Sequence, residues 1–420
     1  TRRFDGTAMG AHLTLQFERM VRLTSVTTEK PFIVDPMTYM FARERENMMK
    51  EKQREDGTTE KVLKKSYEKL AEACGKTVRK ILLEEKRRIL VSDFLDNGKW
   101  NEAFLEELVS RVIQLQKNLV PPDQKKLPDD IEGLMDNEEL ESLYKEGRLL
   151  ALVPPYFYAT SIRDDWYGIT LRCAEKAKDY KGPHRILPLL CLSKEVLQNK
   201  DDWTSILEDL LTHEFHRVLV WFSDMKEFKE DPEVLKRLRE FTSFLSEKLK
   251  VYSAYGGYFF ALLHFFGVEG FSQGMCYGES KNVDKPPVPV GPPLRYYVPF
   301  LHKKVLVEDA RSFYGSFPKN LCNCESCSTI RGRIEKEGLN LEEMPSDYVD
   351  RFFSLMTADD AISHFLRCRE EELDDIRTRD LSEILVKMTA DLEICQQNRV
   401  DDFRGFRTVH LSNWLKALEV

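Results

Sequence analysis

Residues 185–192 read RILPLLCL and residues 217–222 read RVLVWF. Both runs are short, apolar and rich in β-branched or aromatic side chains, which is typical of parallel strands buried on both faces. Similar runs stand at 31–35 (PFIVD), 149–153 (LLALV), 250–254 (KVYSA) and 268–276 (VEGFSQGMC), with 296–300 (YYVPF) as a further candidate. Amphipathic patterns at 164–178 and 232–249 predict helices between them. This alternation predicts a parallel α/β fold.

The chain length leaves two architectures open. Its 420 residues suit a (β/α)8 barrel with insertions, or two or three smaller domains. Periodicity alone does not distinguish a closed barrel from an open sheet. Either way, the 42% of hydrophobic residues are enough for a sizeable core.

One long stretch interrupts the alternation. Residues 42–147 are highly charged and have helical patterns, including RERENMMKEKQRE at 43–55. We interpret them as a helical insertion after the first strand, which either clamps a substrate or partner or serves as a solvated cap. The predicted organisation is therefore residues 1–41 (N-terminal segment and first barrel strand), 42–147 (helical insertion), 148–310 (remainder of the barrel) and 311–420 (zinc-binding and helical region). The extended linker PPVPVGPP at 286–293 precedes this last region, in which 375–395 is the clearest helix.

The motif with the clearest chemistry is the run LCNCESC at 321–327, which places Cys322, Cys324 and Cys327 within six residues. Three thiolates at C-x-C-x2-C spacing can supply three of the four tetrahedral ligands that Zn²⁺ requires. We predict His364, on an apparent helix at 359–370, as the fourth ligand, and Cys368, four residues later, is its rival. Four protein ligands leave no open position on the ion, so this zinc would be structural.

The remaining composition restricts location and partners. Six further cysteines are scattered, unlike a secreted disulfide framework, and no apolar run reaches the roughly 18 residues of a membrane helix. We therefore expect a cytoplasmic protein without a membrane partner. The net charge of −8 argues against a surface that coats nucleic acid throughout. A local basic stretch still predicts phosphate contacts or, alternatively, a solvated loop; its residues are Lys281, Lys285, Arg295, Lys303 and Lys304.

In combination, these features resemble the tRNA-guanine transglycosylase superfamily, which includes the DNA 7-deazapurine transglycosylases. The resemblance covers roughly residues 148–370 and is strongest at 320–329 with His364. The segments GVEGFS at 267–272 and FIVD at 32–35 add to it. It implies a (β/α)8 TIM-like barrel with a C-terminal zinc subdomain, and replacement of guanine in DNA or tRNA by a 7-deazaguanine base. It also makes a homodimer or a partner protein plausible.

Such chemistry requires two carboxylates, one that attacks the ribose C1′ and one that moves protons on the bases. Asp35, directly after an apolar strand, fits the second role or else caps a following helix. Ser272 stands where the family has its nucleophilic aspartate. Glu279 is therefore the predicted nucleophile, with Asp224 and Asp284 as alternatives.

These departures leave three hypotheses. The chain is a base-exchange enzyme, with DNA favoured over tRNA. Alternatively, it is a catalytically silent relative that binds nucleic acid or a partner subunit. In the third hypothesis, it is an unrelated α/β enzyme with a zinc site.

Overall fold

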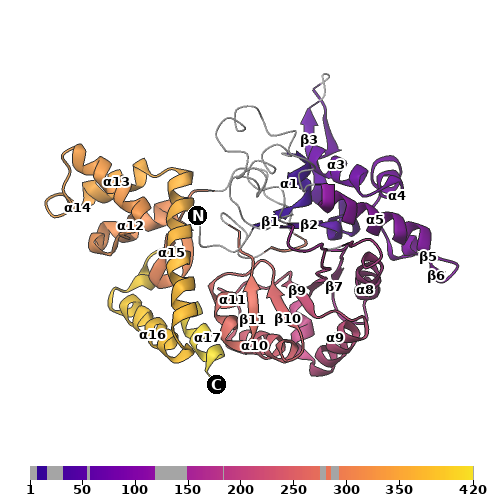
Figure 1. Ribbon diagram of the computed structural model, residues 1–420. Coiled ribbons are helices and arrows are strands. Elements are labelled where there is room, and N and C mark those ends of the chain that lie inside the picture. Colours follow the sequence, from indigo (N-terminus) through magenta and orange to yellow (C-terminus); the bar gives the residue numbers. More distant parts are fainter. Residues whose placement is uncertain are drawn as a thin grey trace, which may run out of the picture. The chain divides into compact units, whose positions relative to one another are not determined.

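The computed structural model describes residues 7–16, 32–53, 57–118, 149–182, 184–274, 281–284 and 293–419. They fall into two units (Figure 1). Unit 1 comprises residues up to Asp224 together with the segment Asn282–Pro287, and unit 2 comprises Met225–Lys281 and Val288–Val420. Among the described helices, none combines the length and apolar character that a bilayer crossing requires.

Parallel strands form the core of unit 1. β1 (Thr7–Gly10) pairs with β2 (Phe32–Asp35), and a bridge joins Phe32 to Leu149 at the start of the next extended segment. That segment ends in β7 (Tyr158–Ala159), which pairs with β8 (Leu189–Leu192), and β8 pairs with β9 (Arg217–Phe222). All four residues of β8 and five of the six in β9 are buried, as their apolar sequences predicted.

The sheet continues with β10 (Lys250–Ser253) and β11 (Val268–Phe271), in the order β11-β10-β9-β8-β7. The structure thus confirms a mixed α/β fold with a five-stranded parallel sheet. The pairings of the described residues do not close the strands into a ring, so the eight-stranded barrel remains a prediction.

Helices follow the strands where the amphipathic patterns predicted them. In unit 1, α8 (Asp165–Ala177) begins after Asp164, whose carboxylate accepts the Trp166 N–H, and α9 (Lys200–Thr212) precedes β9. In unit 2, α10 (Pro232–Ser246) packs against β10 and β11 (Figure 1). The predicted helix at 232–249 is therefore confirmed except for its last turn.

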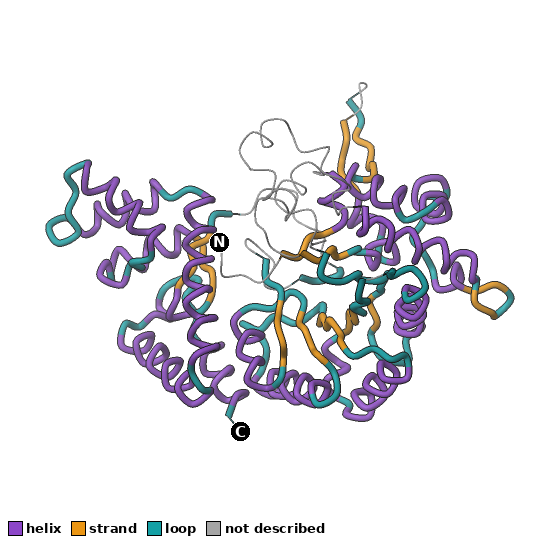
Figure 2. Tube along the Cα trace, in the orientation of Figure 1, coloured by secondary structure: helices purple, strands orange, loops and turns teal. Residues whose placement is uncertain are grey.

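The predicted helical insertion is helical only in part. Residues 43–55 were predicted as helix, but β3 (Met49–Gln53) and β4 (Thr59–Leu63) form an antiparallel hairpin (Figure 2). The side chains of β3 after Met49 are exposed, so a charged sequence can occupy this hairpin, and charge alone had suggested a helix. The 3-10 turn η1 (Thr38–Ala42) leads into this stretch. Its other elements are α3 (Lys65–Ala73), α4 (Lys76–Arg79), the π-helix η3 (Lys80–Glu84), the 3-10 turns η2 (Arg45–Met48) and η4 (Val91–Phe94), the hairpin β5 (Leu95–Asp96) and β6 (Lys99–Trp100), and α5 (Glu102–Asn118). Residues 119–147 lie outside the described part of the chain.

A buried amide attaches α5 to the strand segment at 149–159. Gln116 is fully buried; its Nε2 donates to the carbonyl oxygen of Val153 at 2.7 Å, and its Oε1 accepts the Val153 N–H at 2.9 Å. Both backbone polar groups of one buried residue, Val153, are therefore satisfied by a single side chain, as burial requires.

Beyond β11, unit 2 consists of one hairpin followed by helices. β12 (Arg295–Val298) pairs antiparallel with β13 (Lys303–Leu306), so the candidate strand at 296–300 lies in this hairpin and not in the parallel sheet. The helices that follow are α12 (Val307–Ser316), α13 (Glu325–Lys336), α14 (Pro345–Leu355), α15 (Ala358–Thr378), α16 (Leu381–Gln397) and α17 (Val409–Leu418).

The prediction of one helix over 375–395 was wrong. Arg379 adopts an extended conformation that ends α15, and Asp380 caps α16. The Asp380 carboxylate accepts the Glu383 N–H, and the Glu383 carboxylate accepts the Asp380 N–H. This capping box starts a new helix. Because apolar residues recur at helical spacing on both sides of the break, the pattern had suggested one continuous helix.

The Gln116 contact gives a stability prediction. Gln116→Leu leaves the Val153 N–H and C=O buried without their partners, so the free energy of unfolding falls by about 2–4 kcal/mol. Urea denaturation measures this change. Gln114→Leu is the matched control, because exposed Gln114 bonds to Asn118 on the same helix, and its effect stays within about 0.5 kcal/mol. Equal effects of the two substitutions contradict the role given to Gln116.

Candidate functional site

The three clustered cysteines and His364 meet in unit 2. Cys322 and Cys324 precede α13, and Cys327 lies in its first turn, while His364 lies on α15, which packs against α13. The ligand atoms of these four residues all lie within 4.8 Å of one another. The structure therefore brings together the four side chains that the sequence predicted as a metal site.

The separations fit a tetrahedral ion. Cys324 Sγ and Cys327 Sγ lie 3.3 and 3.4 Å from His364 Nδ1. Ligands at tetrahedral angles about an ion with metal–sulfur bonds of about 2.3 Å and metal–nitrogen bonds of about 2.0 Å are separated by roughly 3.5–3.8 Å. With all four ligand atoms within 4.8 Å of one another, the cluster could hold a metal ion.

The orientation of His364 is set by its neighbours. Its Nε2 donates to the carbonyl oxygen of Tyr297 at 2.8 Å, and its ring stacks on Tyr296 with centroids 4.3 Å apart. Because Nε2 donates to the carbonyl, Nδ1 is the ring nitrogen that faces the sulfurs and is the one that could bind an ion. A backbone carbonyl that fixes the tautomer in this way is a common support of metal-binding histidines.

Cys368, the rival fourth ligand, lies one turn beyond His364. Its Sγ is 3.5 Å from His364 Nδ1 and 3.8 Å from Cys322 Sγ. The set of ligand atoms within 4.8 Å of one another contains His364 and does not contain Cys368. The geometry thus favours His364 as the fourth ligand, and Cys368 is a fifth side chain in contact with the cluster.

The thiols divide into two kinds. The contact with Cys324 raises the pKa of Cys322, but hydrogen bonds with Cys327 and Cys368 outweigh it and lower the pKa to about 5. Hydrogen bonds from Cys322, Cys327 and Cys368 also hold the pKa of Cys324 far below its ordinary value, whereas Cys322 and Cys324 raise the pKa of Cys327. Two sulfurs therefore ionise readily, and the thiolate is the form that binds a metal ion.

Asp35 lies in unit 1, at the end of β2. Its side chain is buried, and its Oδ1 accepts hydrogen bonds from the Tyr156 hydroxyl at 2.7 Å and the Met37 N–H at 2.9 Å. It caps no helix, because the next one, η1, starts after Met37. The carboxylate is thus held in a fixed orientation where a parallel strand ends.

The other candidate carboxylates have partners or lie outside the described residues. Asp224 Oδ1 accepts the Lys194 N–H at 3.0 Å, and Asp284 forms an ion pair with Arg43. Glu279 is outside the described part of the chain. Ser272 Oγ accepts the Tyr255 N–H at 3.2 Å, which ties it to the loop after β10.

The predicted phosphate-binding cations mostly contact other parts of unit 2. Lys281 Nζ donates to the Tyr255 hydroxyl at 2.9 Å, and Lys304 Nζ donates to the Gly274 carbonyl at 3.2 Å and lies 3.6 Å from the centroid of the Phe365 ring. Lys303 donates to the Arg407 carbonyl, and burial lowers its pKa to about 8. Arg295 begins β12, and Lys285 is not among the described residues.

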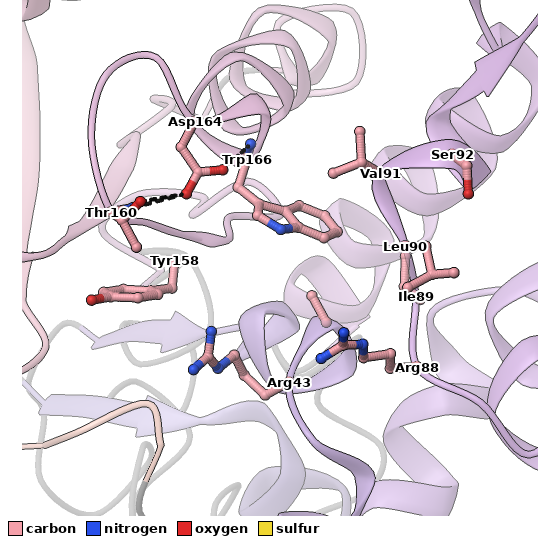
Figure 3. A pocket seen from close by; sticks show the side chains of 11 residues that line it. Arg43, Arg88, Ile89, Leu90, Val91, Ser92, Tyr158, Thr160, Asp164 and Trp166 are labelled. Carbon is pink, nitrogen blue, oxygen red and sulfur yellow. Dashed lines mark hydrogen bonds between the residues drawn. The ribbon is translucent and has the colours of Figure 1, made fainter.

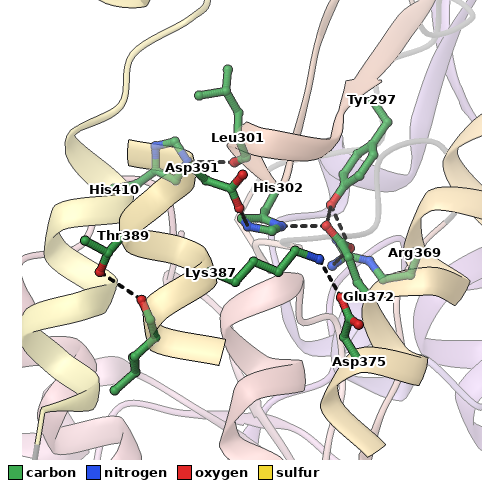
Figure 4. Close-up of polar contacts among 11 residues, drawn as sticks. Tyr297, Leu301, His302, Arg369, Glu372, Asp375, Lys387, Thr389, Asp391 and His410 are labelled. Atoms are coloured by element: carbon green, nitrogen blue, oxygen red, sulfur yellow. Dashed lines mark hydrogen bonds and ion pairs between the residues drawn. The ribbon is translucent and has the colours of Figure 1, made fainter. Parts of the chain in front are cut away.

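Sequence reasoning missed two features. One is a pocket in unit 1 with Arg43, Arg88 and Trp166 in its wall (Figure 3). The other is a buried charge network in unit 2 (Figure 4). The pocket joins three separate segments and has no local motif. For the network, the available signal was the spacing of Arg369 and Glu372, which lie three residues apart and so on one face of a helix.

The buried network centres on Glu372 of α15. Its carboxylate accepts from the Tyr297 hydroxyl at 2.7 Å and from Arg369 Nη1 at 2.7 Å, and His302 Nδ1 lies 2.5 Å away (Figure 4). His302 Nε2 is 3.5 Å from the Asp391 carboxylate on α16. Burial lowers the pKa of His302, but the two carboxylates outweigh it and raise the pKa above its ordinary value.

No protein-family model, no curated protein and no solved structure matches this chain. The likeness to tRNA-guanine transglycosylases thus remains a prediction from the motifs.

The cluster geometry predicts the outcome of removing individual sulfurs. We expect metal analysis of the pure protein to find about one ion per chain, with Cys324→Ser and Cys327→Ser losing most of it because each lacks one tetrahedral ligand. Cys368→Ser is the matched control and keeps the ion. If Cys368→Ser loses as much metal as Cys327→Ser, then Cys368 and not His364 is the fourth ligand.

The network predicts a pH-dependent contribution to stability. Because the folded pKa of His302 is raised, its contribution is complete below the unfolded value of about 6.5 and disappears as the pH rises through the folded value. His302→Asn tolerates the left-handed backbone at this position (φ 50°) and lacks the titrating group. We expect it to lower the free energy of unfolding by about 3–5 kcal/mol at pH 6.

Denaturation of both proteins between pH 5.5 and 9 measures this effect. The difference between wild type and His302→Asn is expected to shrink toward the alkaline end of the range. A difference that is constant or grows with pH would show that His302 is not charged in the folded protein.

Proposed function

We propose that this chain is a base-exchange transglycosylase that replaces guanine in a nucleic acid with a 7-deazaguanine, with DNA favoured over tRNA. The observation that carries the proposal is the meeting of the C-x-C-x2-C sulfurs with a helical histidine, in a chain whose parallel strands include one that ends in a fixed carboxylate. In this proposal the parallel strands belong to a (β/α)8 barrel, and its active site lies at their carboxyl ends.

The metal ion in this proposal is Zn²⁺. Three thiolates and one imidazole are a ligand set that Zn²⁺ accepts in tetrahedral sites. With four protein ligands, no position remains for water or substrate, so the ion holds α13 against α15 and takes no part in the reaction. Unit 2 then depends on the ion for its stability.

Asp35 is the proton-transfer group in the proposed reaction. The Tyr156 hydroxyl and the Met37 N–H both bind Oδ1, so the carboxylate has one orientation while protons leave and return. Guanine departs with the electrons of its glycosidic bond and takes up a proton. The incoming 7-deazaguanine gives up a proton before it bonds to C1′.

Glu279 is the proposed nucleophile. Its carboxylate bonds to C1′ as guanine leaves, and the incoming base displaces it. Asp224 and Asp284 are weaker candidates, because the first accepts a backbone N–H and the second is paired with Arg43. The target nucleotide has to leave its base stack for either carboxylate to reach it.

One observation favours a second function. Ser272, where the family has its aspartate, accepts the Tyr255 N–H through its hydroxyl and the Gly256 N–H through its carbonyl. A serine used in this way organises a loop and cannot replace a carboxylate at C1′. A catalytically silent relative that binds nucleic acid or a partner subunit is therefore the alternative.

A guanine-exchange assay tests the proposal. Purified protein is incubated with radiolabelled guanine and either duplex DNA or tRNA, and label in the nucleic acid is counted. We expect incorporation into DNA, lowered about 10²- to 10⁴-fold in Asp35→Asn because the proton-transfer group is lost. Asp96→Asn, which changes an exposed carboxylate at the β5–β6 turn, keeps wild-type activity.

Two results decide between the alternatives. Absence of exchange on both nucleic acids, from protein that contains its metal and still binds them, supports the silent relative. If exchange occurs, loss of it in Glu279→Gln with an unchanged melting temperature assigns the nucleophile, whereas unchanged exchange removes Glu279 from consideration.

A further inference from the structure

Unit 1 contains a pocket of about 540 Å³ beyond the end of β7. This volume is within the range of roughly 300–1,000 Å³ that is usual for small-ligand sites. The wall comes from the end of η1, the segment before η4, and the β7–α8 connection. Two of these three segments belong to the stretch that interrupts the parallel α/β pattern, so the pocket is a feature of this chain's insertion.

One side of the pocket is aromatic and apolar. Trp166 is only partly buried; its ring packs on Phe157 with centroids 4.8 Å apart, which holds the indole in place. Tyr158 lies beside it in the wall, and Leu90, which is 39% exposed, lies across from it (Figure 3). Fixed aromatic rings of this kind offer stacking surfaces for a planar base.

Two arginines enter the pocket from the other side. Figure 3 shows the Arg43 guanidinium below Tyr158 and the Arg88 guanidinium below Trp166, both in the pocket wall. Each has an exposed carboxylate partner, Asp284 for Arg43 and Glu44 for Arg88. Exposed pairs of this kind are weak, so an incoming anion can displace them.

Two details favour an anion beside these arginines. Arg43 Nε is buried and has no hydrogen-bond partner among the described residues. The carboxylate in the wall, Asp164, is already bonded to the Thr160 N–H, the Thr160 hydroxyl and the Trp166 N–H. An anion near the arginines would thus satisfy an orphaned donor, while the one acidic group in the wall is occupied as a helix cap.

Two segments of the chain lead from the Asp35 carboxylate to the pocket wall. Arg43 follows η1, which starts three residues after Asp35. Tyr158 is two residues beyond Tyr156, whose hydroxyl binds Asp35, and the Arg43 guanidinium lies 5.2 Å from the centroid of the Tyr158 ring. A strand with one base at Asp35 would therefore bring a neighbouring nucleotide to the pocket.

We propose that this pocket binds one nucleotide of a single-stranded nucleic acid segment, with the base stacked on Trp166 and Tyr158 and the phosphate held by Arg43 and Arg88. The inference rests on the proposed function in that it names a contact of the same substrate. It adds that the insertion, and not only the strands, holds the nucleic acid.

Fluorescence anisotropy with a fluorescein-labelled thymidine 12-mer tests the inference on the full chain. Trp166→Ala is expected to weaken binding about 5- to 150-fold, because one stacking contact is lost, while Trp166→Phe retains most of the affinity. Arg88→Ala is expected to reduce the slope of log affinity against log salt by about 0.7, the value for one phosphate contact on a single strand. Arg79→Ala is the matched control, since Arg79 is an exposed arginine of unit 1, paired with Glu84, outside the pocket wall.

Each outcome decides the inference. Unchanged affinity in Trp166→Ala together with an unchanged salt slope in Arg88→Ala overturns it. If thymidine monophosphate competes as well as unlabelled 12-mer at equal concentration, the pocket is a site for free nucleotides. That result overturns the proposal that it binds a nucleotide within a single-stranded nucleic acid. If Asp35→Asn binds the 12-mer normally but exchanges no guanine, both this inference and the proposed function are supported. If the wild-type chain binds through the pocket but exchanges no guanine, this inference is supported and the proposed enzymatic function is overturned.

Discussion

The hydrogen bond from His364 Nε2 to the carbonyl oxygen of Tyr297 is the contact on which the organisation of unit 2 depends. It aims Nδ1 at the sulfurs of the cysteine cluster. The hydroxyl of the same tyrosine donates to Glu372, the centre of the buried charge network. One residue of β12 therefore orients the histidine of the cysteine cluster and anchors a buried carboxylate, and a shift of this strand would disturb both.

The buried network brings α15, α16 and the β12–β13 hairpin together. A buried carboxylate is costly without partners, and Glu372 has Arg369, His302 and Tyr297 around it. Desolvation of these groups offsets much of their attraction, so the network adds less to stability than its contacts suggest. Its clearer effect is to define a single arrangement of the three elements, since any other arrangement leaves a charge buried and unpaired.

What the sequence could predict followed from local pattern. The strands at 189–192 and 217–222 are buried on both faces, so their residues are apolar in succession and were recognised. The cysteine–histidine cluster was predicted because three thiols lie within six residues. The hairpin at 49–63 was missed, since an exposed strand can have the same charged composition as a helix. The pocket was missed because Arg43, Arg88 and Trp166 become neighbours only through tertiary structure.

The contact between Gln116 and Val153 also concerns how this chain could be shortened. The long stretch after the first strand resembles a detachable module, yet its last described helix supplies the partners for both backbone polar groups of Val153 in the strand region. Excising that stretch would leave two polar atoms of the scaffold in apolar surroundings. A smaller homologue, natural or engineered, has to replace the Gln116 amide with another polar side chain or an internal water. The sequence of the insertion and the sequence of the strand region can therefore change only together at this contact.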